Sequence, residues 1–127
     1  MGTTNKHTDV PDVAARLIAS IEAADGDGFL ACFAPGAVIW HNNDNLDSDP
    51  AQSLKVLGWL RRRVDRLRYE EIRVQPTPAG YVEQHVLRGT RADGLPFEVP
   101  ARLVVAVEDG LITRLDEYVD ASGLGAL

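Results

Sequence analysis

The chain has 127 residues, 45% of them hydrophobic and 25% charged, so one domain with a core of its own is expected rather than a disordered chain. A formal net charge of −6 argues against a nucleic-acid partner, because such binding needs a basic face. No apolar run reaches the length of about 18 residues that a membrane span needs, and the N-terminus lacks the apolar core of a signal peptide. We therefore predict a cytoplasmic protein with neither a nucleic-acid nor a membrane partner.

Two residue types need comment before the elements. Cys32 is the only cysteine, which excludes an internal disulfide and fits a reducing compartment; its apolar neighbours favour a small buried side chain. Five arginines lie between positions 61 and 68. They could grip phosphate, but at a helix end they also complement the helix dipole, and we favour the second interpretation.

The first half of the chain predicts three helices. Residues 1–9 are polar and are expected to form a flexible arm. From Val10 the apolar residues recur with the spacing of an amphipathic helix, which ends at Asp25-Gly26. Asp27 is then expected to cap a short second helix. The third begins at 49–52 (Asp-Pro-Ala-Gln), where a capping aspartate, a proline at the first position and a glutamine form a capping box.

The strands are predicted between and after these helices. A β-prone segment at 37–42 precedes a polar loop at 43–49. Four longer strands follow the third helix, and Asp-Gly pairs typical of hairpin turns join the last three; the four are expected at 67–75, 81–90, 96–107 and 111–120. Pro100 cannot donate to a central ladder and therefore predicts an edge strand or a bulge.

Together these elements indicate an α+β fold. Strands about ten residues long make a sheet that must twist, and a bulge bends it further. We predict a cone-shaped, curved antiparallel sheet packed against three N-terminal helices, a cystatin-like roll that encloses one pocket. A single domain is expected to cover 10–122, followed by a flexible tail at 123–127.

Three segments carry a family resemblance. Trp40-His41-Asn42, the strand that holds His85, and the closing Arg-Leu-Asp-Glu-Tyr-Val-Asp at 114–120 resemble, in this order of elements, the SnoaL-like branch of the nuclear transport factor 2-like superfamily. Ketosteroid isomerases, polyketide cyclases and limonene epoxide hydrolase are relatives in that superfamily. The resemblance covers 10–122 and implies a deep pocket inside the curled sheet and a homodimer formed across its outer face.

The resemblance also suggests site residues. Trp40 and Asn42 look like the aromatic and amide pair on the first strand of the epoxide hydrolase, and Asp120 looks like the carboxylate that ends its last strand. Glu83 and His85 stand where that enzyme has an arginine and an aspartate, so its water-activating set is absent. The tyrosine and protonated-aspartate pair of ketosteroid isomerase is not evident either. The polyketide cyclase pattern, an aspartate with a histidine or another polar group nearby, is the least contradicted.

His85 is the residue that we single out. Alternation places it on one strand face with Tyr81, Glu83 and Leu87, and imidazole titrates nearest to neutral pH, as a proton shuttle must. Asp120 is the preferred partner and Glu83 the second. The alternatives are a half-buried histidine satisfied within the sheet, and a strand-end aspartate in solvent.

The other candidates have structural alternatives too. Asn42 is expected to donate a hydrogen bond to a developing oxyanion or to be a turn residue. Trp40 is expected to form pocket wall or core, and Tyr118 to bind the ligand or to be a core tyrosine. His41, opposite Trp40, is assigned to the surface or the dimer face. A bulge would exchange the two faces of the last strand, so the acid that faces the pocket stays open.

These residues predict an enzyme without cofactor, of isomerase or cyclase type, that transfers a proton on a small apolar carbonyl compound through His85 and Asp120, with Trp40, Asn42, Glu83 and Tyr118 around the substrate. The alternatives are a non-catalytic, dimeric small-ligand-binding protein and a variant epoxide hydrolase. No metal is predicted, because the histidines and aspartates lack ligand spacing. A phosphate loop and a nucleophile elbow are not found in the sequence.

Overall fold

The structure is a computed structural model that describes residues 9–120, 122 and 124. Its elements follow in the order α1 (Asp12–Glu22), α2 (Gly26–Leu30), β1 (Phe33–His41), β2 (Leu46–Ser48), α3 (Pro50–Arg61), β3 (Val64–Thr77), β4 (Gly80–Arg91), β5 (Pro96–Glu108) and β6 (Leu111–Val119). This arrangement confirms the predicted α+β class. The predicted flexible arm and tail fall outside the described residues, apart from Asp9 and Leu124.

The helices begin where capping side chains stand. At α3, the Asp49 carboxylate accepts a hydrogen bond from the Gln52 backbone N–H at 2.8 Å, and the Gln52 side chain accepts one from the Asp49 N–H at 3.2 Å. This is the predicted capping box. At α2, Asp25 rather than Asp27 is the cap, because its carboxylate accepts from the Gly28 N–H at 2.9 Å.

The sheet has the strand order β2-β1-β6-β5-β4-β3. Neighbouring strands are antiparallel except β1 and β6, which run parallel. The strand β2 lies in a segment for which we predicted a polar loop; its three residues pair with the end of β1. So short and polar a segment shows no alternation from which a strand can be predicted.

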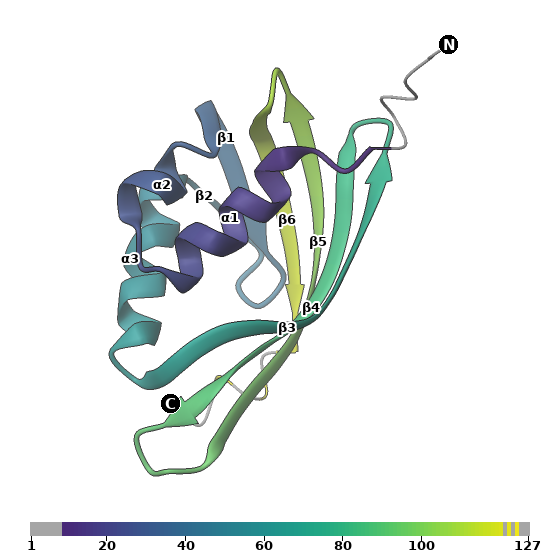
Figure 1. Ribbon diagram of the computed structural model, residues 1–127. Coiled ribbons are helices and arrows are strands. Elements are labelled where there is room, and N and C mark those ends of the chain that lie inside the picture. Colours follow the sequence, from purple (N-terminus) through teal and green to yellow (C-terminus); the bar gives the residue numbers. More distant parts are fainter. Residues whose placement is uncertain (1–8, 121, 123, 125–127) are drawn as a thin grey trace.

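The sheet bends along β3, and the three helices lie on one side of it (Figure 1). The pairing of β3 with β4 shifts register between Asp65 and Arg68 and again between Glu70 and Arg73. Arg66 and Glu71 lie within these two shifts with φ of 58° and 55°. Such bulges leave residues unpaired and increase the local curvature.

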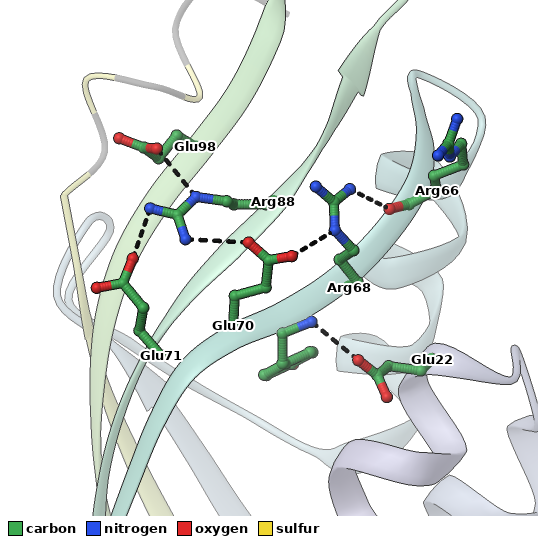
Figure 2. Close-up of polar contacts among 8 residues, drawn as sticks. Glu22, Arg66, Arg68, Glu70, Glu71, Arg88 and Glu98 are labelled. Atoms are coloured by element: carbon green, nitrogen blue, oxygen red, sulfur yellow. Dashed lines mark hydrogen bonds and ion pairs between the residues drawn. The ribbon is translucent and has the colours of Figure 1, made fainter.

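An ion cluster lies at the second bulge, on the sheet face opposite to the helices, which we call the outer face. Figure 2 shows the Arg88 guanidinium between three carboxylates, those of Glu70 at 3.1 Å, Glu71 at 2.7 Å and Glu98 at 3.0 Å. Arg68 adds a bond to Glu70 at 2.7 Å. Because Glu70 and Glu71 belong to β3, Arg88 to β4 and Glu98 to β5, the cluster joins three strands at the bend.

The prediction for Pro100 is wrong for the strand as a whole. β5 is an interior strand, and its pairing with β4 is continuous through Pro100. However, the ladder between β5 and β6 ends at Ala101 and Val119. Pro100 lies just beyond that end and only accepts, from the Asp120 N–H at 3.1 Å. A missing N–H therefore breaks no ladder bond there.

Two apolar clusters fill the face that the helices cover, which we call the inner face. The first joins α1 and α2 to the sheet, through residues such as Leu17, Phe29, Tyr81, Val105 and Leu115. The second lies near the end of α3 and contains Leu60, Val64, Leu67, Phe97 and Val99. Cys32 belongs to the first cluster, as predicted, and burial raises the pKa of its thiol. Among the described helices, none is long and apolar enough to cross a membrane.

Candidate functional site on the inner face of the sheet

The strand β4 places two ionisable side chains on the inner face. Its alternation is as predicted: Tyr81, Glu83 and His85 are buried, whereas the residues between them are only partly covered. Glu83 is 1% exposed and His85 is 4% exposed. On the strand they lie between Tyr81 of the first apolar cluster and Leu87, which packs against the second. A buried acid and base in apolar surroundings are costly unless they satisfy each other.

Glu83 and His85 satisfy part of each other's hydrogen-bonding capacity. His85 Nδ1 lies 2.7 Å from Glu83 Oε2. A charged carboxylate can only accept, so a neutral imidazole bonded to it carries its proton on Nδ1 and keeps a lone pair on Nε2. The other carboxylate oxygen, Oε1, is buried without a hydrogen-bond partner in the described part of the chain. A buried polar atom left unsatisfied in this way suggests a functional role.

Tyr69 of β3 covers the imidazole. The two ring centroids are 4.4 Å apart, at an interplanar angle of 57°. Burial raises the pKa of the Tyr69 hydroxyl well above its ordinary value, and the negative charges of Glu117 and Glu83 raise it further. The hydroxyl therefore stays protonated near neutral pH and can only act as a donor to an anion. Tyr69 was not among the predicted site residues, although it stands two residues after the buried Leu67, between the two bulges, and alternation alone places it on the same face.

A second acid–base pair lies in the same row of the sheet. Strand register aligns Glu83, Leu103, Glu117 and His41 across β4, β5, β6 and β1. His41 Nε2 lies 2.9 Å from Glu117 Oε1, and this hydrogen bond raises the pKa of His41 against the opposing effect of burial. The structure thus places His41 half-buried on the inner face, not on the surface or dimer face that we expected.

The structure shows which acid of β6 lies on the inner face. The pairing of β5 with β6 shifts register between Ala106 and Val107. Beyond this shift Leu115 is buried in the core, so Glu117 and Val119 share its face, and Asp116, Tyr118 and Asp120 lie on the other. The inner-face acid of β6 is therefore Glu117.

The structure does not bring Asp120 to His85. The Asp120 N–H bonds to Pro100, and Pro100 pairs with Val86, whose side chain leaves β4 on the face opposite to His85. The exposed Asp120 carboxylate accepts from the Ser122 hydroxyl at 2.7 Å and from its N–H at 3.1 Å. These bonds lower the pKa of Asp120. A general base near neutral pH needs the opposite shift.

The remaining candidates make their side-chain contacts with residues other than His85. Trp40 Nε1 donates to Asn45 at 2.9 Å, and the indole packs edge-on against Tyr118 with centroids 5.1 Å apart. The Asn42 amide bonds to the Val119 backbone at 2.8 and 3.3 Å, which occupies both of its ends. Tyr118 borders a hollow of about 900 Å³ on the outer face; His85 is also among its lining residues, although the His85 side chain is only 2% exposed. Of the expected site residues in the described chain, therefore, only Glu83 is hydrogen-bonded to His85.

The inner side has a hollow of its own. It measures about 230 Å³, lies between α1, α2 and α3, and is bordered by Arg61. The positive charge of Arg61 lowers the pKa of Tyr69, opposing burial and the nearby glutamates. At the same helix end, the Arg63 guanidinium carbon stacks 4.3 Å from the Trp59 ring centroid.

In the described ranges, no three or more His, Cys, Asp and Glu side chains gather in a group that could hold a metal ion.

Comparisons with known proteins identify the family. Residues 14–115 match the SnoaL-like domain, so the chain belongs to the SnoaL-like family within the nuclear transport factor 2-like superfamily, which confirms the resemblance. The curated proteins include no match to it.

Solved structures share the fold. IdmH from Streptomyces antibioticus, a proposed polyketide cyclase, is 20% identical, with a TM-score of 0.80 over 91% of this chain and 94% of that one. A protein from Catenulispora acidiphila with a ketosteroid isomerase-like fold, solved with trimethylamine, is 13% identical, with a TM-score of 0.78 over 93% and 92%. A proposed polyketide cyclase from Xanthomonas campestris is 19% identical, with a TM-score of 0.76 over 90% and 92%.

Proposed function

We propose that this protein is a cofactor-independent enzyme of isomerase or cyclase type, which transfers a proton on a small apolar carbonyl compound at Glu83 and His85. One observation carries the proposal: a buried carboxylate holds a buried imidazole at 2.7 Å, while its second oxygen has no partner in the described chain. Membership of the SnoaL-like family supports chemistry of this kind. The pair replaces the expected combination of His85 with Asp120.

The chemical step follows from the hydrogen bond. His85 Nε2 removes a proton from the carbon next to the carbonyl, and the C–H electron pair moves onto the carbonyl oxygen to give an enolate. The imidazole is then positively charged, and the Glu83 carboxylate stabilises it through the bond to Nδ1. In an isomerisation the proton returns to another carbon. In a cyclisation the enolate carbon attacks a second carbonyl of the same molecule, and the new alkoxide takes up the proton.

The enolate oxygen needs a donor. Tyr69 is the best placed candidate, because its ring contacts the imidazole and its raised pKa keeps the hydroxyl protonated. Such a donor typically contributes a rate factor of about 100 to 1,000. In this proposal Tyr69 takes the role that we expected of Asn42, whose amide is bonded to backbone.

Deuterium exchange tests the proposal. The exchange of protons next to the carbonyl is followed by NMR for steroid-like, polyketide-like and terpenoid ketones in D₂O. We expect the wild-type protein to accelerate exchange in at least one compound, and His85→Ala to lose about 100-fold or more of that rate. Gln84→Ala is the matched control, because Gln84 borders the outer hollow on the next position of the same strand.

Two results would contradict the proposal. One is exchange at the full rate in His85→Ala. The other is thermal stabilisation of the protein by some of these ketones without exchange in any of them, which would favour the alternative of a binding protein without catalysis.

A further inference from the structure

The hollow between the helices has apolar walls and one charged end. Its lining includes the apolar side chains of Ile21, Phe29, Leu54 and Leu57, and Arg61 borders it. Pockets for drug-sized ligands measure about 300–1,000 Å³, so a hollow of about 230 Å³ suits a small ligand or one part of a larger one. The apolar wall requires that this part carry little polarity besides the group that meets Arg61.

Arg61 is a cation for which the described residues supply no counter-ion. It stands eight residues after Ser53 and four after Leu57, so all three share one face of α3. Its Nη2 is buried without a hydrogen-bond partner, and so is the Ser53 hydroxyl, as far as the structure describes the chain. Within the same residues no carboxylate forms an ion pair with Arg61. Arg61 as a whole is partly exposed, but its Nη2 gives up hydration without gaining a partner in the described chain, which is a cost to a group that keeps its charge.

Nearby carboxylates limit the charge of a bound anion. Asp25 borders the hollow, but its carboxylate accepts from the Gly28 N–H. Glu22 accepts from the Tyr69 N–H at 2.9 Å (Figure 2). Glu83 and Glu117 act on Tyr69 from the sheet. A single arginine among these acids can balance one negative charge, so a monoanion is favoured over a dianion such as phosphate.

We propose that the substrate is an oxo acid, an apolar carbonyl compound with one carboxylate, and that Arg61 binds this carboxylate. Arg61 acts electrostatically on Tyr69, whose ring contacts His85, so the Arg61 end of the hollow is the end related to the proposed acid–base pair. The carbonyl half of this proposal rests on the proposed function. The carboxylate half is tested by binding alone.

The probes are 4-oxo-4-phenylbutanoate and its primary amide, which match in size and differ in charge. Titration calorimetry is expected to show that the wild-type protein binds the carboxylate about tenfold or more tightly than the amide. Arg61→Gln should abolish this preference. Arg62→Gln should keep it, because Arg62 is the neighbouring, exposed arginine at the same helix end. The melting temperature of Arg61→Gln should equal or exceed that of the wild type, because a charged group with a buried, unpartnered nitrogen is removed.

Several results would overturn the carboxylate site: no binding of 4-oxo-4-phenylbutanoate, equal binding of both probes, a preference that survives Arg61→Gln, or inorganic phosphate binding as tightly as the carboxylate. His85→Ala separates the two proposals, since it should lose exchange and keep the carboxylate preference. A preference for the carboxylate without exchange in the wild type would refute the proposed function and leave the carboxylate site standing.

Discussion

At the scale of residues, the inner face holds two acid–base pairs with different surroundings. Glu83 and His85 belong to one strand and are almost fully buried. Glu117 and His41 come from neighbouring strands, and their side chains are 22% and 29% exposed. Burial makes the first pair sensitive to the loss of either partner, whereas solvent near the second screens its interaction. Only the first has an unsatisfied carboxylate oxygen in the described chain.

The second pair makes stability depend on pH. The hydrogen bond from Glu117 raises the pKa of His41 above its ordinary value of 6.5, so the folded state binds the proton more tightly than the unfolded state does. The added stability is therefore fully present below about pH 6.5 and is lost as the pH rises through the raised value. We expect Glu117→Gln to lower the free energy of unfolding by up to about 1 kcal/mol at pH 6, and by less at pH 9. Urea unfolding of both proteins measures this, and an equal difference at the two pH values would refute it.

The sequence correctly predicted the strand face of some candidate residues and left that of others open. Alternation correctly placed Glu83 and His85 on one face, because β4 pairs with β5 without interruption. It could not choose between Asp120 and Glu117, because that choice depends on the register shift near Ala106, where two residues of one strand oppose one of the other. Nothing in the sequence marks that position.

At the scale of elements, the bulges of β3 bring the chain close to β4. Gly89 lies opposite the first of them: a Cβ added there would overlap the Val64 side chain and come within 2.7 Å of the Asp65 carbonyl oxygen. Local signals predicted the elements themselves, such as the capping box of α3 and the Asp-Gly turns. Bulges and the parallel pairing of β1 with β6 depend on contacts distant in sequence, so local patterns did not show them.

Substitution at Gly89 tests this close approach. Gly89→Ala should lower the free energy of unfolding by about 1–3 kcal/mol, because backbone on β3 must move. Gly58→Ala is the contrasting control: the added Cβ would meet only the Arg62 side chain, at 3.7 Å. It should raise the stability by about 0.5–1 kcal/mol, since alanine suits a helix interior better than glycine. Guanidinium unfolding distinguishes the two signs, and a neutral Gly89→Ala would contradict the described packing.

At the scale of the whole molecule, α1, α2 and α3 all lie on one side of the sheet and leave its outer face uncovered (Figure 1). It carries exposed apolar side chains, including Val104 at 45% and Tyr118 at 49% exposure, beside the larger hollow. An exposed apolar patch of this kind is typical of a protein interface. The homodimer that the family resemblance implies is therefore best placed here, and it remains a proposal.

Sedimentation equilibrium tests the dimer. The wild-type protein should sediment at twice the chain mass at micromolar concentration, and Val104→Asp should shift it to the monomer, because a buried carboxylate at the interface is costly. Val56→Asp serves as the control, since Val56 is also exposed but lies on α3. A monomeric wild type, or a Val104→Asp variant that stays dimeric, would contradict the proposed interface.

The central claim is that proton transfer depends on Glu83 and His85, and the choice between two carboxylates tests it most directly. The measurement is the rate of deuterium exchange next to the carbonyl, for the best ketone, in the wild type, Glu83→Gln and Asp120→Asn. We predict a loss of about 100-fold or more in Glu83→Gln, because the imidazole loses its charged partner, and a rate close to that of the wild type in Asp120→Asn. A loss in Asp120→Asn with full exchange in Glu83→Gln would contradict the account.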